Sequence, residues 1–189
     1  MTHTSYYSDA ELSALGFAHV GRNVRISRHT SLYGTGGMSI GDNVRIDDFC
    51  VLSGRIALGS HIHIAAYCGL FGGGGITLGD FAGLSSRVSI YSESEDYSGA
   101  CLTNPTIPDA YRRIDSAPVT LGRHTIVGAG AVILPGADIG DGSSVGALSL
   151  VTRPLDPWGV YAGVPARRLK ARKKDLLEHE RDFLGGAHG

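Results

Sequence analysis

A short polar stretch places three carboxylates within four residues of one another, at Glu93, Glu95 and Asp96. A carboxylate can orient an amine, attract its ammonium form, or accept a proton from it. Two serines, Ser85 and Ser86, come ten residues before Glu95 and Asp96 and could donate hydrogen bonds. Acidic clusters are also common on exposed loops, so a catalytic and a purely solvated interpretation both stay open here.

These acids begin a segment, residues 91–118, that differs from the rest of the chain. It contains three prolines and several side chains able to make specific contacts, among them Tyr91, Tyr97, Asn104, Arg112 and Arg113. Loops longer than about 12–15 residues in a compact domain are usually functional or disordered. We therefore predict that this segment is a functional loop, inserted into a regular scaffold.

On both sides of the loop an aliphatic residue returns every six positions, with two steps of eight and one gap from Ile90 to Leu121. Before the gap the positions are Val20, Ile26, Leu32, Ile40, Ile46, Leu52, Leu58, Ile64, Leu70, Leu78, Leu84 and Ile90. After it they are Leu121, Val127, Ile133, Ile139, Val145 and Val151.

A period of six fits neither a helix nor a half-buried strand. It fits a coil with three short sides, each of which turns one aliphatic residue inward, and the positions make about six coils. Glycines that follow the aliphatic residue, such as Gly21, Gly41 and Gly59, should take positive φ or permit close backbone approach. The steps of eight, at residues 35–37 and 72–75, predict bulged corners.

The two ends of the repeat predict caps. Ser8 and Glu11 have the spacing of a helix capping box, so residues 1–19 should hold a short helix over the first coil. The β-helix should span residues 20–153. Residues 154–189 should form a C-terminal segment, helical from about Leu169, within one domain of 189 residues.

The composition limits the classes of molecule that the protein could bind. Lys plus Arg number 17 and Asp plus Glu 18, which argues against a general affinity for nucleic acid or an anionic membrane. We see neither a signal peptide nor a stretch of about 18 apolar residues. The three cysteines lack metal or redox spacing. We expect a cytoplasmic protein with reduced thiols.

The repeats V-G-R-N-V-R, I-G-D-N-V-R and L-G-R-H-T-I resemble those of the hexapeptide-repeat acyltransferases, over residues 20–151. The resemblance implies an all-β fold, a left-handed parallel β-helix with an inserted loop and a C-terminal helix. It also implies a homotrimer with active sites between subunits, and an acyl-CoA co-substrate without a permanently bound cofactor or metal.

Within that family the chain is most similar to the N-acyltransferases of dTDP-4-amino-4,6-dideoxy sugars, of the anthrose or viosamine type, which serve lipopolysaccharide and O-antigen synthesis. The matching stretches include GDFAGLSSRVSIY and DYSGACLTNPTIPDAY. The resemblance implies that the chain moves an acyl group to the amine of a nucleotide-linked sugar by direct attack.

The loop departs from the commoner family pattern, in which it carries a catalytic histidine. Residues 91–120 contain no histidine, and Glu95 stands at that position, as in the anthrose-type enzymes. A sugar hydroxyl needs a strong base, whereas an amine with a pKa of about 8 is partly neutral already, so a carboxylate favours N-acylation. We predict Glu95 as the principal proton acceptor, Asp96 as the second, and Ser85 in the active site. The predicted substrate-binding residues are Ser86, Arg87, Tyr91, Tyr97 and His63.

The stretch YAGVPARRLK resembles the family's G-[VN]-P-A-[KR] signature beside the coenzyme A tunnel. The basic side chains offer charge to the phosphates of coenzyme A. The implied acyl-CoA-binding residues are Ala129, Ala147, Gly163, Val164, Pro165, Arg167, Lys170 and Lys173.

Two other functions remain open. A sugar O-acetyltransferase would need another base, such as His63 or His124, and a non-catalytic β-helix scaffold would bind no coenzyme A. Metal binding is not predicted, because the histidine spacing of the zinc enzymes that share this fold is absent. The sequence does not distinguish the sugar epimer, the amine position, or an acetyl from a 3-hydroxybutyryl donor.

Overall fold

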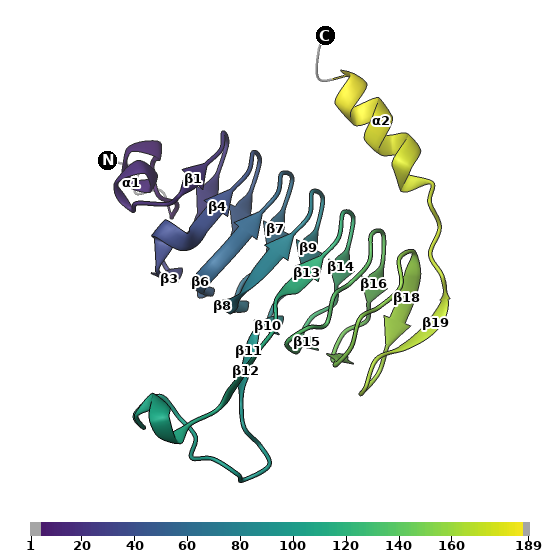
Figure 1. The fold of residues 1–189 in the computed structure, drawn as a ribbon. Helices are drawn as coiled ribbons and strands as arrows, with labels where there is room; N and C mark the ends of the chain where they lie inside the picture. Colours follow the sequence, from purple (N-terminus) through teal and green to yellow (C-terminus); the bar gives the residue numbers. More distant parts are fainter. Residues whose placement is uncertain (1–4, 187–189) are drawn as a thin grey trace.

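Each repeat of six residues forms a short strand and a corner, and successive coils stack into one column (Figure 1). The computed structural model describes residues 5–186. Neighbouring coils pair as parallel strands in register, so each strand meets its equivalent in the next repeat. The column is therefore the stacked β-helix that the period of six predicts.

One side of the column is a parallel sheet, and the serines of the candidate site directly follow one of its inner strands, β9. Its strands, in order, are β2 (Arg25–Ile26), β5 (Arg45–Ile46), β7 (His63–Ile64), β9 (Gly83–Leu84), β14 (Ile126–Val127), β16 (Ser144–Val145) and β18 (Gly159–Ala162).

The other two sides are joined because two strands continue around a corner. They contain β1 (His19–Val20), β3 (Ser31–Tyr33), β4 (Met38–Ile40), β6 (Val51–Leu58), β8 (Gly69–Leu78), β10 (Ser89–Tyr91), β13 (Val119–Leu121), β15 (Val132–Ile133) and β17 (Leu150–Val151). The corner shared by β6 and β8 has a register shift at residues 54–56, and residues Thr35–Gly37 form a 3-10 turn (η1). Both predicted insertions therefore lie at irregular corners.

The inward positions form a continuous apolar core. Ile26, Ile46, Ile64, Leu84 and Val127 stack above one another and are 2% exposed or less. Burial of one such side chain stabilises a fold by about 1.5–3 kcal/mol. The hydrophobic period is confirmed as the core-forming pattern.

The corner glycines are needed for space rather than for positive φ. A Cβ on Gly21 would lie 2.4 Å from an oxygen of Asp42, and one on Gly41 would lie 2.6 Å from the carbonyl of Gly59. Of the two predicted alternatives, close backbone approach is confirmed, and positive φ is not found at these glycines. The left-handed conformation falls two residues later, for example at Asn23 (φ 55°), and asparagine tolerates it well.

The N-terminal cap is helix α1 (Asp9–Ala14). Its capping box is confirmed, because the Ser8 N–H donates to Glu11 and the Glu11 N–H donates back to the Ser8 hydroxyl. Arg28 adds two hydrogen bonds to the Glu11 carboxylate, at 2.7 and 2.6 Å. Residues 1–4 of the predicted cap segment, like residues 187–189 at the other end, lie outside the described residues.

The C-terminal segment differs from its prediction. Leu169 lies in strand β19 (Arg167–Ala171), which pairs antiparallel with β18, and helix α2 begins only at Leu176 and ends at Gly186. The predicted helix start is wrong because the free edge of β18 offers backbone partners that a helix would leave unpaired. None of the helices within residues 5–186 is long and apolar enough to cross a membrane.

Helix α2 is attached to one corner edge of the column. Glu180 pairs with Arg123 and with Nε2 of His124, which lies 2.8 Å away. The Phe183 ring packs edge-on against Phe81, which stacks on His124. The helix therefore lies along this edge, away from the inserted loop (Figure 1).

The inserted loop stands on a two-stranded ribbon. Strand β11 (Glu93–Glu95) pairs antiparallel with β12 (Ile114–Ser116), and a 3-10 turn (η2, Asp109–Tyr111) lies beyond them. We call these two strands the ribbon. Figure 1 shows that the ribbon projects from the column and holds the rest of the loop away from it.

Candidate active site

The tip of the ribbon is organised around Asp96. This side chain is buried and accepts hydrogen bonds from the backbone N–H groups of Ser98, Ala100 and Cys101, at 3.0–3.1 Å. The Ser98 hydroxyl and Arg113 also donate to it. Hydrogen bonds from Ser98, first among these contacts, hold the pKa of Asp96 below its usual range. Asp96 is therefore a fixed, ionised group.

Glu95 is bound on one oxygen and free on the other. Its Oε1 accepts from Arg112 at 3.1 Å, and Arg112 also binds Asp109 at 2.8 Å. Oε2 of Glu95 and Nε of Arg112 are buried without a hydrogen-bond partner among the described residues. Buried polar atoms normally have partners, so these two atoms are candidates for a contact that the isolated chain does not supply.

Both acids line one recess, which we call the loop recess, of about 630 Å³. Tyr97, also predicted as a substrate-binding residue, lies on its wall and is 93% exposed. Five further residues complete the lining, and the sequence did not assign any of them to the site: Gly99, Cys101, Thr103, Asn104 and Pro105. Three of the predicted site residues thus lie together here.

A second recess, the serine recess, lies on the sheet of β7, β9 and β14 and has a volume of about 310 Å³. Its lining residues are His63, Ala65, Gly83, Leu84, Ser85, Ser86 and Ile126. It brings together the predicted residues His63, Ser85 and Ser86. Gly83 and Ile126 were missed, because a strand glycine and an exposed isoleucine have no distinctive sequence signal.

His63 is held by a chain of polar contacts. Its Nε2 lies 2.8 Å from Asp47, which also accepts from Arg45 at 2.6 Å. Burial alone would raise the pKa of Asp47, but the hydrogen bonds from His63 and Arg45 outweigh it and lower that pKa. The imidazole ring is thus oriented by a carboxylate, as in many general bases.

The two recesses are separate within one chain. They share no lining residue, and among residues 5–186 no hydrogen bond or ion pair joins Ser85 or Ser86 to Glu95 or Asp96. The serines lie at the corner before β10, whereas the ribbon leaves after β10. One chain therefore holds two halves of the predicted site without bringing them together.

A line of small residues connects the serine recess to the C-terminal segment. The Gly130 N–H donates to Ser86 and the Leu148 N–H donates to Ala129, so Ser86, Ala129 and Ala147 occupy successive coils of one corner edge. The Leu150 N–H donates to Gly163, which continues the edge into the VPAR turn. We call this edge the small-residue track. Its coils lie about 4.8 Å apart.

Basic side chains gather where the track ends. Arg167 and Lys170 lie on β19 and, like Lys173, are exposed to solvent. Val164 and Pro165 are exposed in the turn before them. Arg172 anchors the segment, because its Nη1 donates to the carbonyls of His124 at 2.7 Å and Gly142 at 3.0 Å. The implied coenzyme A residues are thus continuous with the serine recess.

Two predicted substrate-binding residues lie outside both recesses. Arg87 follows Ser86 but lies over the Tyr67 ring, 5.2 Å from its centre. Tyr91 stacks on Phe71 at 4.9 Å, at the base of the ribbon. Within the described part of the chain no group of three or more His, Cys, Asp or Glu side chains could hold a metal ion.

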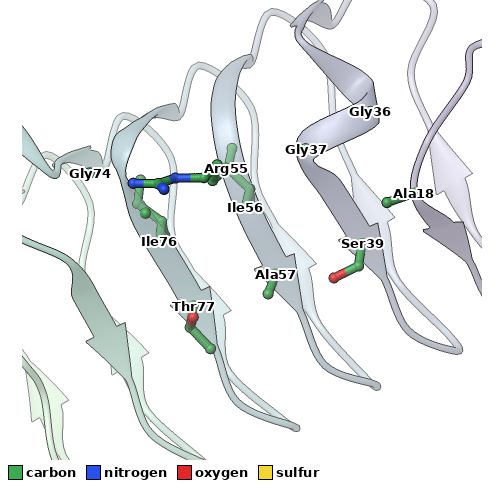
Figure 2. Close-up of a pocket in the computed structure, with 11 residues that line it drawn as sticks. Ala18, Gly36, Gly37, Ser39, Arg55, Ile56, Ala57, Gly74, Ile76 and Thr77 are labelled. Carbon is green, nitrogen blue, oxygen red and sulfur yellow. The ribbon is translucent and has the colours of Figure 1, made fainter.

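A further recess, of about 460 Å³, lies on the sheet that contains β4, β6 and β8 (Figure 2). Ser39, Ala57 and Thr77 form its floor, and Arg55 lies across one end. None of the sequence-predicted site residues lines it. Apart from Arg55, Ile56 and Ile76, its lining residues have short side chains or none.

Comparison with known proteins identifies relatives along the whole chain. Residues 118–153 match the family model for the bacterial transferase hexapeptide (six repeats). The chain is 44% identical over 188 residues to a dTDP-4-amino-4,6-dideoxy-D-glucose acyltransferase of Escherichia coli, with 98% of each chain covered.

The structure superimposes on AntD, an N-acyltransferase from Bacillus cereus solved with dTDP and 3-hydroxybutyryl-CoA. The TM-score is 0.96 at 48% identity, and 99% of this chain and 100% of AntD are covered. Further AntD structures hold a replaced serine or a replaced aspartate ten positions later. This agreement confirms the left-handed winding of the coils, and the chain belongs to the hexapeptide-repeat acyltransferases.

Proposed function

We propose that this protein transfers an acyl group from an acyl-CoA to the amine of a dTDP-linked 4-amino-4,6-dideoxy sugar, with dTDP-4-amino-4,6-dideoxyglucose as the first candidate. The observation that carries the proposal is the loop recess, where two carboxylates stand and no histidine does. The similarity to the Escherichia coli enzyme and to AntD, which has been solved with that sugar nucleotide, supports it.

The donor would lie along the small-residue track. Ser86, Ala129 and Ala147 leave room for the pantetheine arm, and backbone groups near Gly163 can meet its amides. Arg167, Lys170 and Lys173 would bind the phosphates through charge-assisted hydrogen bonds. This arrangement carries the thioester toward Ser85 and Ser86.

The two loop carboxylates have different roles in this proposal. Asp96, ionised and fixed, would attract and orient the amine. Glu95 would take the proton on Oε2, the oxygen without a partner. The serine and aspartate replaced in AntD are ten residues apart, as Ser86 and Asp96 are here, which supports a role for that pair.

The reaction needs no covalent enzyme intermediate. The neutral amine attacks the thioester carbon, and hydroxyl or backbone donors near Ser85 and Ser86 stabilise the tetrahedral oxyanion. The C–S bond then breaks, the amide forms, and the sulfur leaves as a thiol after it takes up a proton. Because both reactants are held in place, most of the rate acceleration would come from their proximity and orientation.

The complete site would form between subunits of a homotrimer in the cytoplasm. The ribbon of one subunit would place Glu95 and Asp96 beside the serine recess of its neighbour. The face in Figure 2 supports such assembly, because the short side chains of Ser39, Ala57 and Thr77 permit another chain to approach closely.

One observation favours a second candidate, sugar O-acetylation. His63 lies in the serine recess and is oriented by Asp47, so it could act as the stronger base that a hydroxyl requires. This function predicts that His63→Gln abolishes activity, whereas the N-acyltransferase should retain most of it.

A thiol-release assay tests the proposal. We would combine acetyl-CoA and 3-hydroxybutyryl-CoA with dTDP-linked sugars that carry either a 4-amino or a 4-hydroxyl group. Thiol release should require the amino sugar. Release with the hydroxyl sugar alone would establish the O-acetyltransferase, and no release with any acceptor would refute both functions.

A further inference from the structure

Gly83 interrupts a row of side chains on the outer face of the column. The row contains one residue per coil, and in register it reads Arg45, His63, Gly83, Ile126 and Ser144. The residues on both sides of Gly83 carry bulky side chains, and Ile126 is 48% exposed. Gly83 therefore leaves a gap one side chain deep.

The backbone does not require glycine at this position. Gly83 lies in an ordinary strand, is not among the glycines with positive φ, and a Cβ added to it would meet no atom within 4 Å. Gly21 and Gly41, by contrast, face atoms at 2.4–2.6 Å. Glycine inside a strand weakens it, and often marks a place where a ligand approaches closely.

The gap is part of the serine recess. His63 and Ile126 form its two walls, and Ser85 and Ser86 form the rim next to the small-residue track. One wall is apolar and the other carries a ring held at Nε2 by Asp47. A side chain at residue 83 would fill the space between them.

We infer that Gly83 sets the length of the acyl group that the protein accepts, by leaving room for a chain longer than acetyl, such as butanoyl. This inference rests on the proposed function. A thioester delivered along the track to Ser86 must extend its acyl group past the rim, and the gap at Gly83 lies immediately there. Contact with Ile126 would favour an aliphatic chain.

The acceptor sugar is the alternative occupant of the gap. The loop recess fits that sugar better, because it is about twice as large as the serine recess and contains the carboxylates that bind an amine. The gap beside Ile126 contributes an apolar wall, which a polar sugar does not need.

The test uses the full-length protein and the variants Gly83→Ala and Gly83→Val. The ratio of kcat/KM for butanoyl-CoA to kcat/KM for acetyl-CoA should fall modestly in Gly83→Ala and by about 30-fold or more in Gly83→Val, since one methylene group in a pocket discriminates by roughly 10–200-fold. Thermal melting of each variant verifies the fold. Ser144→Val places the same valine side chain in the same row outside the recess, and should affect neither donor.

Equal losses with both donors would place the acceptor in the gap and overturn the inference, and so would unchanged kinetics in Gly83→Val. Calorimetric titration of the two CoA thioesters without acceptor gives a second readout. Gly83→Val should weaken binding of butanoyl-CoA and not of acetyl-CoA. This binding result holds even if no amino sugar is a substrate, so a failure of the proposed acceptor is distinguishable from a failure of the acyl gap.

Discussion

Two adjacent carboxylates have very different surroundings in this protein. Asp96 accepts hydrogen bonds from three backbone N–H groups and two side chains, whereas Glu95 keeps one oxygen without a partner. A carboxylate saturated with donors is a weak base, because each donor favours the charged form. The proposed roles of the two carboxylates, orienting group for Asp96 and proton acceptor for Glu95, depend on this difference in hydrogen bonding.

The first prediction concerns Glu95. Glu95→Gln keeps the size and one hydrogen-bonding oxygen but removes the basicity, so kcat should fall by about 10²-fold or more, the usual contribution of a general base. Steady-state thiol release at pH 7 with saturating amino sugar measures it.

Glu93→Gln is the matched control, because Glu93 lies on the same strand, outside the loop recess. Its kcat should not change. If Glu95→Gln retains near-full activity while Asp96→Asn loses it, the proton acceptor is Asp96 and the division of roles is incorrect.

The residues of the candidate site could be predicted from the sequence, but their hydrogen-bond partners could not. Glu95, Asp96, Ser85 and Ser86 are recognisable as candidates because they are reactive and lie beside a break in the repeat. The partners that distinguish Glu95 from Asp96 come from Arg112 and from backbone groups, and a loop's hydrogen bonds leave no periodic signal. Gly83 was missed for a related reason, since its importance lies in an absent side chain.

At the scale of the secondary-structure elements, the stability of helix α1 depends on the charge of Glu11. A hydrogen bond from Arg28, followed by those from Ser8, lowers the pKa of Glu11 from 4.5 to about 2. Because the folded-state pKa is lowered, this carboxylate stabilises the fold above pH 4.5, and its contribution is lost as the pH falls from 4.5 toward 2.

We therefore predict that Glu11→Gln lowers Tm at pH 7, and that the difference from wild type narrows between pH 4.5 and 2. Thermal melting across that range by circular dichroism measures it. Asp9→Asn in the same helix is the control, with a smaller and less pH-dependent effect. A difference that stays constant down to pH 2 would contradict the assignment.

The antiparallel pair of β18 and β19 carries the second element-scale prediction. Arg167→Ala combined with Lys170→Ala should raise KM for acyl-CoA several-fold and change kcat little, since phosphate contacts are equal in the ground and transition states. Arg25→Ala, an exposed arginine in the first coils, is the control. An unchanged KM would place the phosphates elsewhere.

Strands β18 and β19 also show where the prediction of secondary structure from sequence fails. Leu169 fits the apolar face of a helix that continues into α2, so the sequence alone favours a helix from that point. The competing strand exists because β18 is the last strand of its sheet and has a free edge. Whether an edge is free depends on the whole column, which a local pattern does not report. The ribbon of β11 and β12 was missed for a different reason, because its two strands pair with each other across a loop that has no period.

For the whole molecule, the separation of the two recesses predicts shared sites. Co-expression of a chain that carries Ser85→Ala and Ser86→Ala with one that carries Glu95→Gln and Asp96→Asn should restore activity that neither has alone. Every trimer that contains both kinds of chain has one intact site in three, so the mixed trimers should have about a third of the wild-type sites.

Differently tagged copies, purified through both tags, provide the sample, and sedimentation gives its mass. Wild-type chains that carry the same two tags are the control. No recovery in mixed trimers would mean that each site is built within one chain, and a stable monomer at micromolar concentration would exclude the shared site altogether.

The column itself was the most predictable part of the molecule. Its six-residue period states directly which residues face inward, and Ile90 and Leu121 mark both ends of the insertion. The resemblance supplied the handedness, because a period is the same for either hand. The path of the loop was not predictable, since prolines and tyrosines without a period fit many conformations.

The position of the ribbon also bears on how the chain folds. Coils elsewhere in the column pair residues about 20 positions apart, as Ile64 does with Leu84, whereas Leu84 pairs with Val127 across 43. The added closure entropy grows only with the logarithm of length, and amounts to about 0.7 kcal/mol. We expect the coils before the insertion and the coils after it to fold separately, each from its own nucleus. The strand pairing between Leu84 and Val127, which joins the two halves, should form last. The insertion would then delay folding while lowering the stability of the folded column only slightly, which leaves its length free to change during evolution.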